Sequence, residues 1–173
     1  MIRIVSSLSK LVKFKDNEAI VNEGSLFSEI LFFVKGEAIV YKTLKLENNG
    51  VYFEETIEID QLNEGDVFGE KFYLSKEISS IKIVGKSRGE FIKVSFKDNV
   101  NTIDTPLYKR IRQNAVRYPT DQEILDQYKV YLMQKLKQLE YLNDLYKMNK
   151  NKNPELITIK NKLSKIKTAK LAQ

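Results

Sequence analysis

Short apolar segments, separated by glycine or charge, fill the first hundred residues and restrict the fold more than any other feature. Between Glu18 and Tyr41 the chain reads EAIVNEG, ILFFVKG and EAIVY, and later SIKIVG and EFIKVSF. The apolar runs are short and rich in Ile, Val and Phe, which is typical of β-strands. About seven or eight such strands at close spacing favour a small antiparallel barrel or roll.

Turn signals lie between these segments. Asn48-Asn49-Gly50 predicts a hairpin turn, because Asn and Gly tolerate a positive φ. Lys86 to Gly89 and Glu64-Gly65-Asp66 predict two further turns. Gly69 then opens a segment, Glu70 to Leu74, that is long enough for one helical turn. The first backbone N–H groups of such a turn are unpaired and can bind an anion.

The remaining segments are expected to be helical. We expect one helix around Ser6 to Val12 and another over residues 106–117, where Pro106 suits the first helical position. The capping box Thr120-x-x-Glu123 predicts the start of a long helix, whose apolar stripe continues to about Lys147. Residues 155–169 either form one further basic helix or stay loose.

We therefore expect an α+β chain, with an antiparallel β-roll (a double-stranded β-helix, jelly-roll-like) followed by C-terminal helices. Residues 1–105 should form the roll with its N-terminal helix, and residues 106–149 the helices that pack on the roll or dimerise. Residues 150–173 should form a basic tail. Residues 1–105 carry 14 Lys and Arg against 17 Asp and Glu, whereas residues 106–173 carry 15 against 6. The net charge of +6 thus belongs to the C-terminal part.

The composition excludes several kinds of chemistry. The chain has no cysteine and no histidine, so it lacks disulfides, thiolate metal sites and the usual general base at neutral pH. Glu54 and Glu55 are adjacent on a strand and face opposite sides, so they cannot converge on one substrate. No P-loop or nucleophile elbow occurs. We expect no enzyme and no metal site. Without an apolar run of membrane-span length or a signal-peptide core, the expected location is cytoplasmic.

One combination of residues resembles a known family. Gly24 and Gly36 flank an apolar strand, and Gly65-Asp66-x-Phe68-Gly69-Glu70 is followed by further strands and long helices. This order is similar to the cyclic nucleotide-binding domain, the β-roll of catabolite activator proteins, cyclic-nucleotide-dependent kinase regulatory subunits and nucleotide-gated channels. The likeness covers about residues 8 to 147.

The resemblance implies a ligand site. In the family, the Glu of this run bonds the ribose 2′-hydroxyl, and backbone amides of the short helix hold the cyclic phosphate. By position, the ligand contacts fall on five residues: Phe68, Gly69, Glu70, Lys71 and Phe72.

The phosphate-pairing arginine of the family follows nine or ten residues after this Glu, where this chain has Ser79 and Ser80. A serine offers one neutral hydrogen bond, whereas a hydrogen bond to a charged group is worth about 1.5–3 kcal/mol. Lys82 lies between two isoleucines on a predicted strand, so its side chain should point to the side opposite theirs. Phe27 is a second departure from the family pattern, since the family often has a small residue at this place in the first glycine turn.

These residues also have a structural interpretation. The carboxylate of Glu70 can stabilise the positive N-terminal end of the short helix, and Ser79 and Ser80 can simply begin a strand. Tyr128 and Tyr131 can stack on a nucleobase, but the stripe of the long helix is first of all core or a dimer seam.

Three functions stay open from the sequence. The first is a non-catalytic regulatory module of this family that senses cyclic AMP or cyclic GMP weakly or atypically, or has lost that ability. The second is a transcription regulator, like the catabolite activators, that binds DNA through the basic tail. About 20 residues after the long helix are too few for a helix-turn-helix and wing. The third is a protein-interaction scaffold.

The partners implied are a cyclic nucleotide, another protein, or a second copy through the helix over residues 120–147. Nucleic acid is the weaker interpretation of the basic tail, and no membrane partner or other cofactor is expected.

Overall fold

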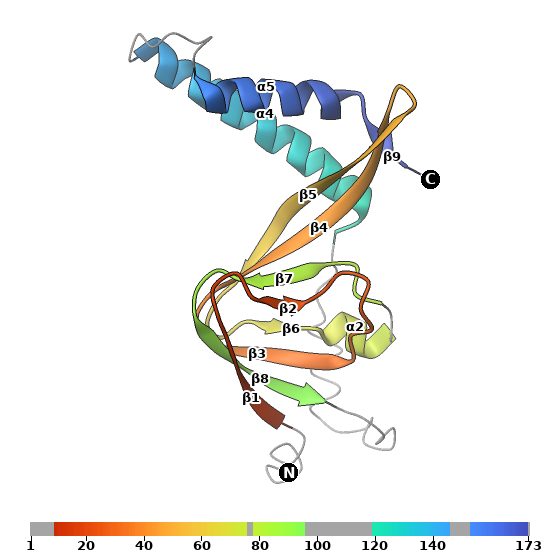
Figure 1. Cartoon of the computed structure of the whole chain (residues 1–173), viewed down its shortest axis with the longest axis vertical. Helices are drawn as coiled ribbons and strands as arrows, with labels where there is room; N and C mark the ends of the chain where they lie inside the picture. Colours follow the sequence, from red (N-terminus) through yellow and green to blue (C-terminus); the bar gives the residue numbers. More distant parts are fainter. Residues whose placement is uncertain (1–8, 76–77, 96–118, 146–152, 173) are drawn as a thin grey trace. The chain divides into compact units, whose positions relative to one another are not determined.

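The computed structural model describes residues 9–75, 78–95, 119–145 and 153–172 (Figure 1). The chain divides into two compact units, Met1–Lys42 with Glu58–Tyr118 and Thr43–Ile57 with Pro119–Gln173. We call them the roll unit and the helical unit. Strands β4 (Ala38–Asn48) and β5 (Val51–Leu62) contribute to both units, because the division crosses each strand. The three domain ranges expected from the sequence stay predictions.

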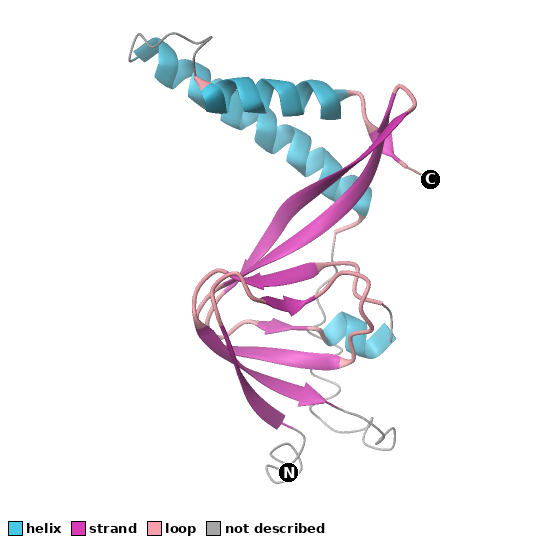
Figure 2. Ribbon diagram, viewed as in Figure 1, coloured by secondary structure: helices cyan, strands magenta, loops and turns pink. Residues whose placement is uncertain are grey.

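Two antiparallel sheets contain the strands (Figure 2). One has the order β1-β8-β3-β6, and the other has the order β2-β7-β4-β5. The strands not yet delimited are β1 (Ser9–Phe14), β2 (Ala19–Val21), β3 (Glu29–Lys35), β6 (Val67–Phe68), β7 (Lys82–Gly85) and β8 (Gly89–Ser95).

Residues from both sheets meet in the core of the roll unit. Phe14, Phe33 and Phe91 of the first sheet pack on one another, with ring centroids 5.9 to 6.0 Å apart. Val40 and Ile83 of the second sheet are buried in the same cluster. Alternate residues of each strand point inward, so the two sheets pack face to face. The expected β-roll is therefore confirmed.

The first described strand corrects one expectation. We expected a helix over Ser6 to Val12, but Ser9–Phe14 forms β1, which pairs antiparallel with β8. Val12 packs against the core and Phe14 is buried, whereas Lys13 between them is exposed and pairs with Glu90 at 3.3 Å. This period of two suits a strand, so the helix prediction was wrong for residues 9–12.

Helices α4 (Asp121–Leu145) and α5 (Pro154–Lys167) and the short strand β9 (Lys170–Leu171) belong to the helical unit. The capping box of α4 is confirmed: the Thr120 N–H donates to Glu123 Oε2 at 2.7 Å, and the Glu123 N–H donates to Thr120 Oγ1 at 3.2 Å. The side chain of Asn153 caps α5 by accepting from two backbone N–H groups.

The helical unit has its own buried apolar side chains from the hairpin and from both helices. They are Leu44, Leu46, Ile57, Ile124, Leu125, Leu132, Leu156, Ile159 and Ile166. The helix expected over residues 106–117 lies outside the described residues. Among the helices that the described residues form, none is long and apolar enough to cross a membrane.

Candidate ligand-binding site

The segment that the sequence assigns to a ligand is a tight turn followed by helix α2 (Glu70–Ser75), directly after β6. Gly69 makes this turn with a φ of +103°, in the left-handed region. A Cβ at this position would collide with the carbonyl oxygen of Glu29 and would lie 2.6 Å from Cε1 of Phe27. Only glycine fits here, because the backbone of the turn touches both the start of β3 and an aromatic ring.

Three phenylalanines fill the space beside this turn. The rings of Phe27 and Phe68 are 5.8 Å apart, those of Phe68 and Phe72 are 5.9 Å apart, and those of Phe27 and Phe72 are 6.4 Å apart. All three side chains are buried and belong to the core cluster of the roll unit. Two expected ligand residues, Phe68 and Phe72, are therefore core side chains, and the ring of Phe27 packs directly against Gly69.

Glu70, the expected ribose contact, begins α2 and is half-buried. Burial raises the pKa of its carboxyl above the ordinary value, and a smaller opposing effect comes from a hydrogen bond with its own backbone N–H. The neighbouring Lys71 is exposed.

Ser79 stands at one of the two positions expected for a phosphate contact, and it is 1% exposed. Its hydroxyl donates to the carbonyl oxygen of Ile81 at 2.8 Å. Its backbone N–H donates to Ser25 O at 2.8 Å, and its carbonyl accepts from the Gly24 N–H at 2.7 Å. The hydroxyl proton and both backbone groups of Ser79 are thus engaged within the chain.

Exposed and buried side chains alternate from Ser79 into strand β7. Ser80 and Lys82 are exposed, whereas Ile81 and Ile83 are buried, which confirms that Lys82 faces away from the core.

One buried cation, Lys42, was not predicted from the sequence. It is 8% exposed and pairs with Glu23 at 3.6 Å. The signal was available, since Lys42 belongs to the inward-facing set of β4 together with Val40 and Leu44.

The two tyrosines of α4 contact each other. The rings of Tyr128 and Tyr131 are stacked with centroids 6.2 Å apart, and the Tyr128 hydroxyl donates to Glu55 Oε1 at 2.9 Å. Burial and the bond to Glu55 raise the pKa of Tyr128. A role in nucleobase stacking stays a prediction.

No family model and no curated protein matches the sequence. Solved structures do match the fold. A cyclic nucleotide-binding domain from Methylobacillus flagellatus has a TM-score of 0.52 at 18% identity, with 65% of this chain and 60% of that chain covered. A transcriptional regulator from Thermotoga maritima has a TM-score of 0.50 at 14% identity, with 84% of this chain and 97% of that chain covered. At such identities the likeness concerns the fold alone: this chain has the cyclic nucleotide-binding fold.

Proposed function

We propose that this chain is a non-catalytic regulatory module whose cassette, the segment Gly69 to Ser80, has lost the capture of a free cyclic nucleotide. The observation that carries the proposal is the state of Ser79. Its side chain is buried, and its hydroxyl is bonded to the carbonyl of Ile81. Neither a charge nor a free hydroxyl proton is then available at a position where the resemblance expects the phosphate clamp.

The packing of Phe27 supports the same proposal. Its ring lies directly against Gly69, so one side of the turn is covered by the chain's own side chain. The N–H groups of a helix start bind an anion only if the anion can approach them. The regulatory output then passes through a protein partner.

Isothermal titration with cyclic AMP and cyclic GMP tests the loss of binding. We expect no saturable heat for the wild-type chain at ligand concentrations up to about 1 mM. Micromolar binding of either nucleotide would overturn the proposal.

A matched pair of variants tests the physical cause. Phe27→Ala with Ser79→Arg opens space and supplies a cation, so we expect it to bind roughly ten- to hundredfold more tightly than Phe27→Ala alone, the value of a charged hydrogen bond. Ser80→Arg in the Phe27→Ala background adds the same charge at an exposed neighbour and should gain nothing. Equal affinities for the two variants would contradict the role assigned to position 79.

A further inference from the structure

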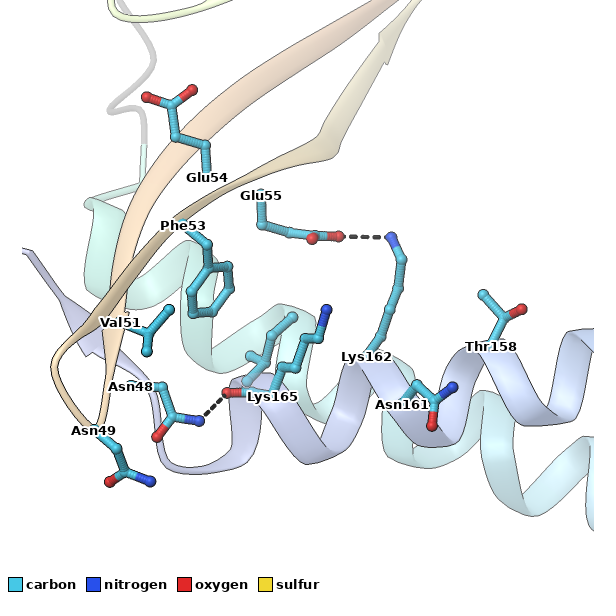
Figure 3. Close-up of a pocket in the computed structure, with 11 residues that line it drawn as sticks. Asn48, Asn49, Val51, Phe53, Glu54, Glu55, Thr158, Asn161, Lys162 and Lys165 are labelled. Atoms are coloured by element: carbon cyan, nitrogen blue, oxygen red, sulfur yellow. Dashed lines mark hydrogen bonds and ion pairs between the residues drawn. The ribbon is translucent and has the colours of Figure 1, made fainter.

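A groove of about 670 Å³ lies within the helical unit, between the hairpin and α5 (Figure 3). Residues of β5 and of the hairpin tip line one side, including Val51, Phe53 and Glu55. The other side consists of one face of α5, with Asn161, Lys162 and Lys165. Strand β5 supplies both apolar side chains and carboxylates, and the helix supplies amide and ammonium groups.

The register of the hairpin shows which backbone groups face outward. Asn49 and Gly50 have φ values of 52° and 77°, so the expected hairpin turn consists of these two residues. The hydroxyls of Thr43 and Thr56 lie 3.3 Å apart across the strands. Residue 45 is therefore opposite residue 54. The Lys45 carbonyl accepts from the Ala172 N–H at 2.9 Å, so the backbone of residue 45 points away from β5.

In an antiparallel pair, opposite residues either both bond to each other or both point outward. Tyr52, Glu54 and Thr56 thus direct their backbone N–H and C=O groups to the outer edge of β5. Among the described strands, β5 ends the sheet order and has β4 as its neighbour. This edge carries the unpaired groups that an added strand needs.

The groove follows this edge. Phe53, Glu54 and Glu55 all line it, although adjacent residues of a strand face opposite sides. Figure 3 shows Phe53 directed toward α5 and Glu54 directed away from it. A cavity that touches all three residues runs along the backbone of the strand.

Some polar side chains of the groove bond to each other, and others have no partner in the described residues. Lys162 donates to Glu55 at 2.6 Å, and the Glu55 side chain is 16% exposed. In the part of the chain that the structure describes, the ammonium of Lys165 and the side-chain amide of Asn161 have no hydrogen bond or ion pair. An acidic side chain in the groove would meet both groups.

A second copy of this chain is a poor occupant of the edge. An antiparallel register that uses Tyr52, Glu54 and Thr56 of both copies is centred on Glu54, so the two Glu54 side chains would stand directly opposite each other. Like charges in opposite positions are destabilising. A cationic side chain on the partner strand would instead be attracted at this position.

We propose that β5 binds an extended segment of another protein as an added strand. The segment bonds to the backbone of Tyr52, Glu54 and Thr56. Its groove-facing side chains are apolar and acidic, opposite Phe53 and Lys165, and its outward-facing side chains are basic, opposite Glu54. This interaction does not depend on the state of the cassette, so it is tested separately from nucleotide binding.

The probe is a fluorescein-labelled peptide that alternates Lys with Val and Glu, compared with a peptide of the same composition in which the lysines form one block. We expect the alternating peptide to bind the full chain roughly tenfold more tightly, because only its order fits the two faces of the strand. Equal binding of the two peptides, or no binding of either up to about 1 mM, would overturn the proposal.

Two substitutions at one residue separate the backbone from the charge. Glu54→Pro removes an outward N–H that β4 does not use, and should weaken binding roughly tenfold. Glu54→Ala keeps the N–H and should weaken binding by at most about threefold. Equal effects of the two changes would refute strand addition.

Amide hydrogen exchange on the peptide-bound chain gives a readout that does not require a variant. Exchange should slow at Tyr52, Glu54 and Thr56 and change little at Phe53 and Glu55, which already bond to β4. Lys165→Glu should weaken binding of the alternating peptide. Lys167→Glu should not, because Lys167 is an exposed residue of the same helix that lies outside the groove. A concentration-dependent dimer that Glu54→Pro abolishes would show that a second copy occupies the edge and would refute the choice of partner.

Discussion

At position 69 the backbone conformation and the surrounding atoms impose the same requirement. Gly69→Ala would place a Cβ against Glu29 O and the Phe27 ring at a positive φ, so we expect the free energy of unfolding to fall by about 2–4 kcal/mol. Gly24→Ala is the control, because Gly24 also has a positive φ but nothing within 4 Å of an added Cβ. It should cost about 1–2 kcal/mol. Urea denaturation measures both values, and an equal loss for the two variants would contradict the contact.

The raised pKa of Glu70 makes a second prediction at the residue scale. A carboxyl whose pKa is higher in the folded state binds its proton more tightly there, so its contribution favours folding at low pH and is lost as pH rises through the folded pKa. At neutral pH the half-buried carboxylate is therefore unfavourable. Glu70→Gln should stabilise the fold at about pH 7, and the gain should shrink at about pH 4.

The measurement for Glu70→Gln is urea unfolding of variant and wild type at both pH values. Glu64→Gln, at an exposed carboxyl in the preceding turn, is the control. A gain at low pH that disappears at neutral pH would reverse the sign and refute the burial effect.

At the scale of elements, Glu55 connects strand β5 with both helices of its unit. It accepts from Tyr128 of α4 and from Lys162 of α5, and the bond to Glu55 raises the pKa of Lys162. Lys162→Met would leave a largely buried carboxylate with one partner fewer, at a cost of about 1–2 kcal/mol after allowance for the exposure of the lysine. Lys167→Met should cost little, and thermal unfolding compares the two.

The same elements show what the sequence could predict. The hairpin turn at Asn49 and Gly50 and the capping box of Thr120 and Glu123 were predictable, because each depends on a few neighbouring residues. Strand β1 was not, since its six residues contain two lysines and take their period from pairing with β8. A turn or a helix cap can be predicted from neighbouring residues alone. Whether a short segment forms a strand depends on the strand with which it pairs.

In the candidate site, the sequence identified the glycine turn and the missing arginine, but not which side chain packs against the turn. That Phe27 packs against Gly69 depends on two segments more than 40 residues apart, and no periodicity reports such a contact. The pairing of Glu23 with Lys42 is non-local in the same way. Side-chain packing between distant strands is the part that the sequence alone leaves open.

At the scale of the whole molecule, the charge is uneven, but three lysines of the C-terminal part form ion pairs within the chain. Lys135 pairs with Glu155, Lys160 with Glu140 and Lys162 with Glu55. We therefore expect duplex DNA to bind weakly and without sequence preference, with a salt dependence equivalent to about two or three phosphates. Fluorescence anisotropy at several salt concentrations measures the slope. A steep slope with a preferred sequence would favour the transcription-regulator alternative.

The enclosure of Ser79 also bears on how such a module changes over generations. An arginine introduced there by a single mutation would enter a space already occupied by the protein, and a buried unpaired charge is severely destabilising. A lineage would first have to shrink a neighbouring side chain, with no benefit until the cation arrives. If the module has lost its nucleotide as proposed, a return by single steps is therefore blocked, and the module is free to specialise in other partners.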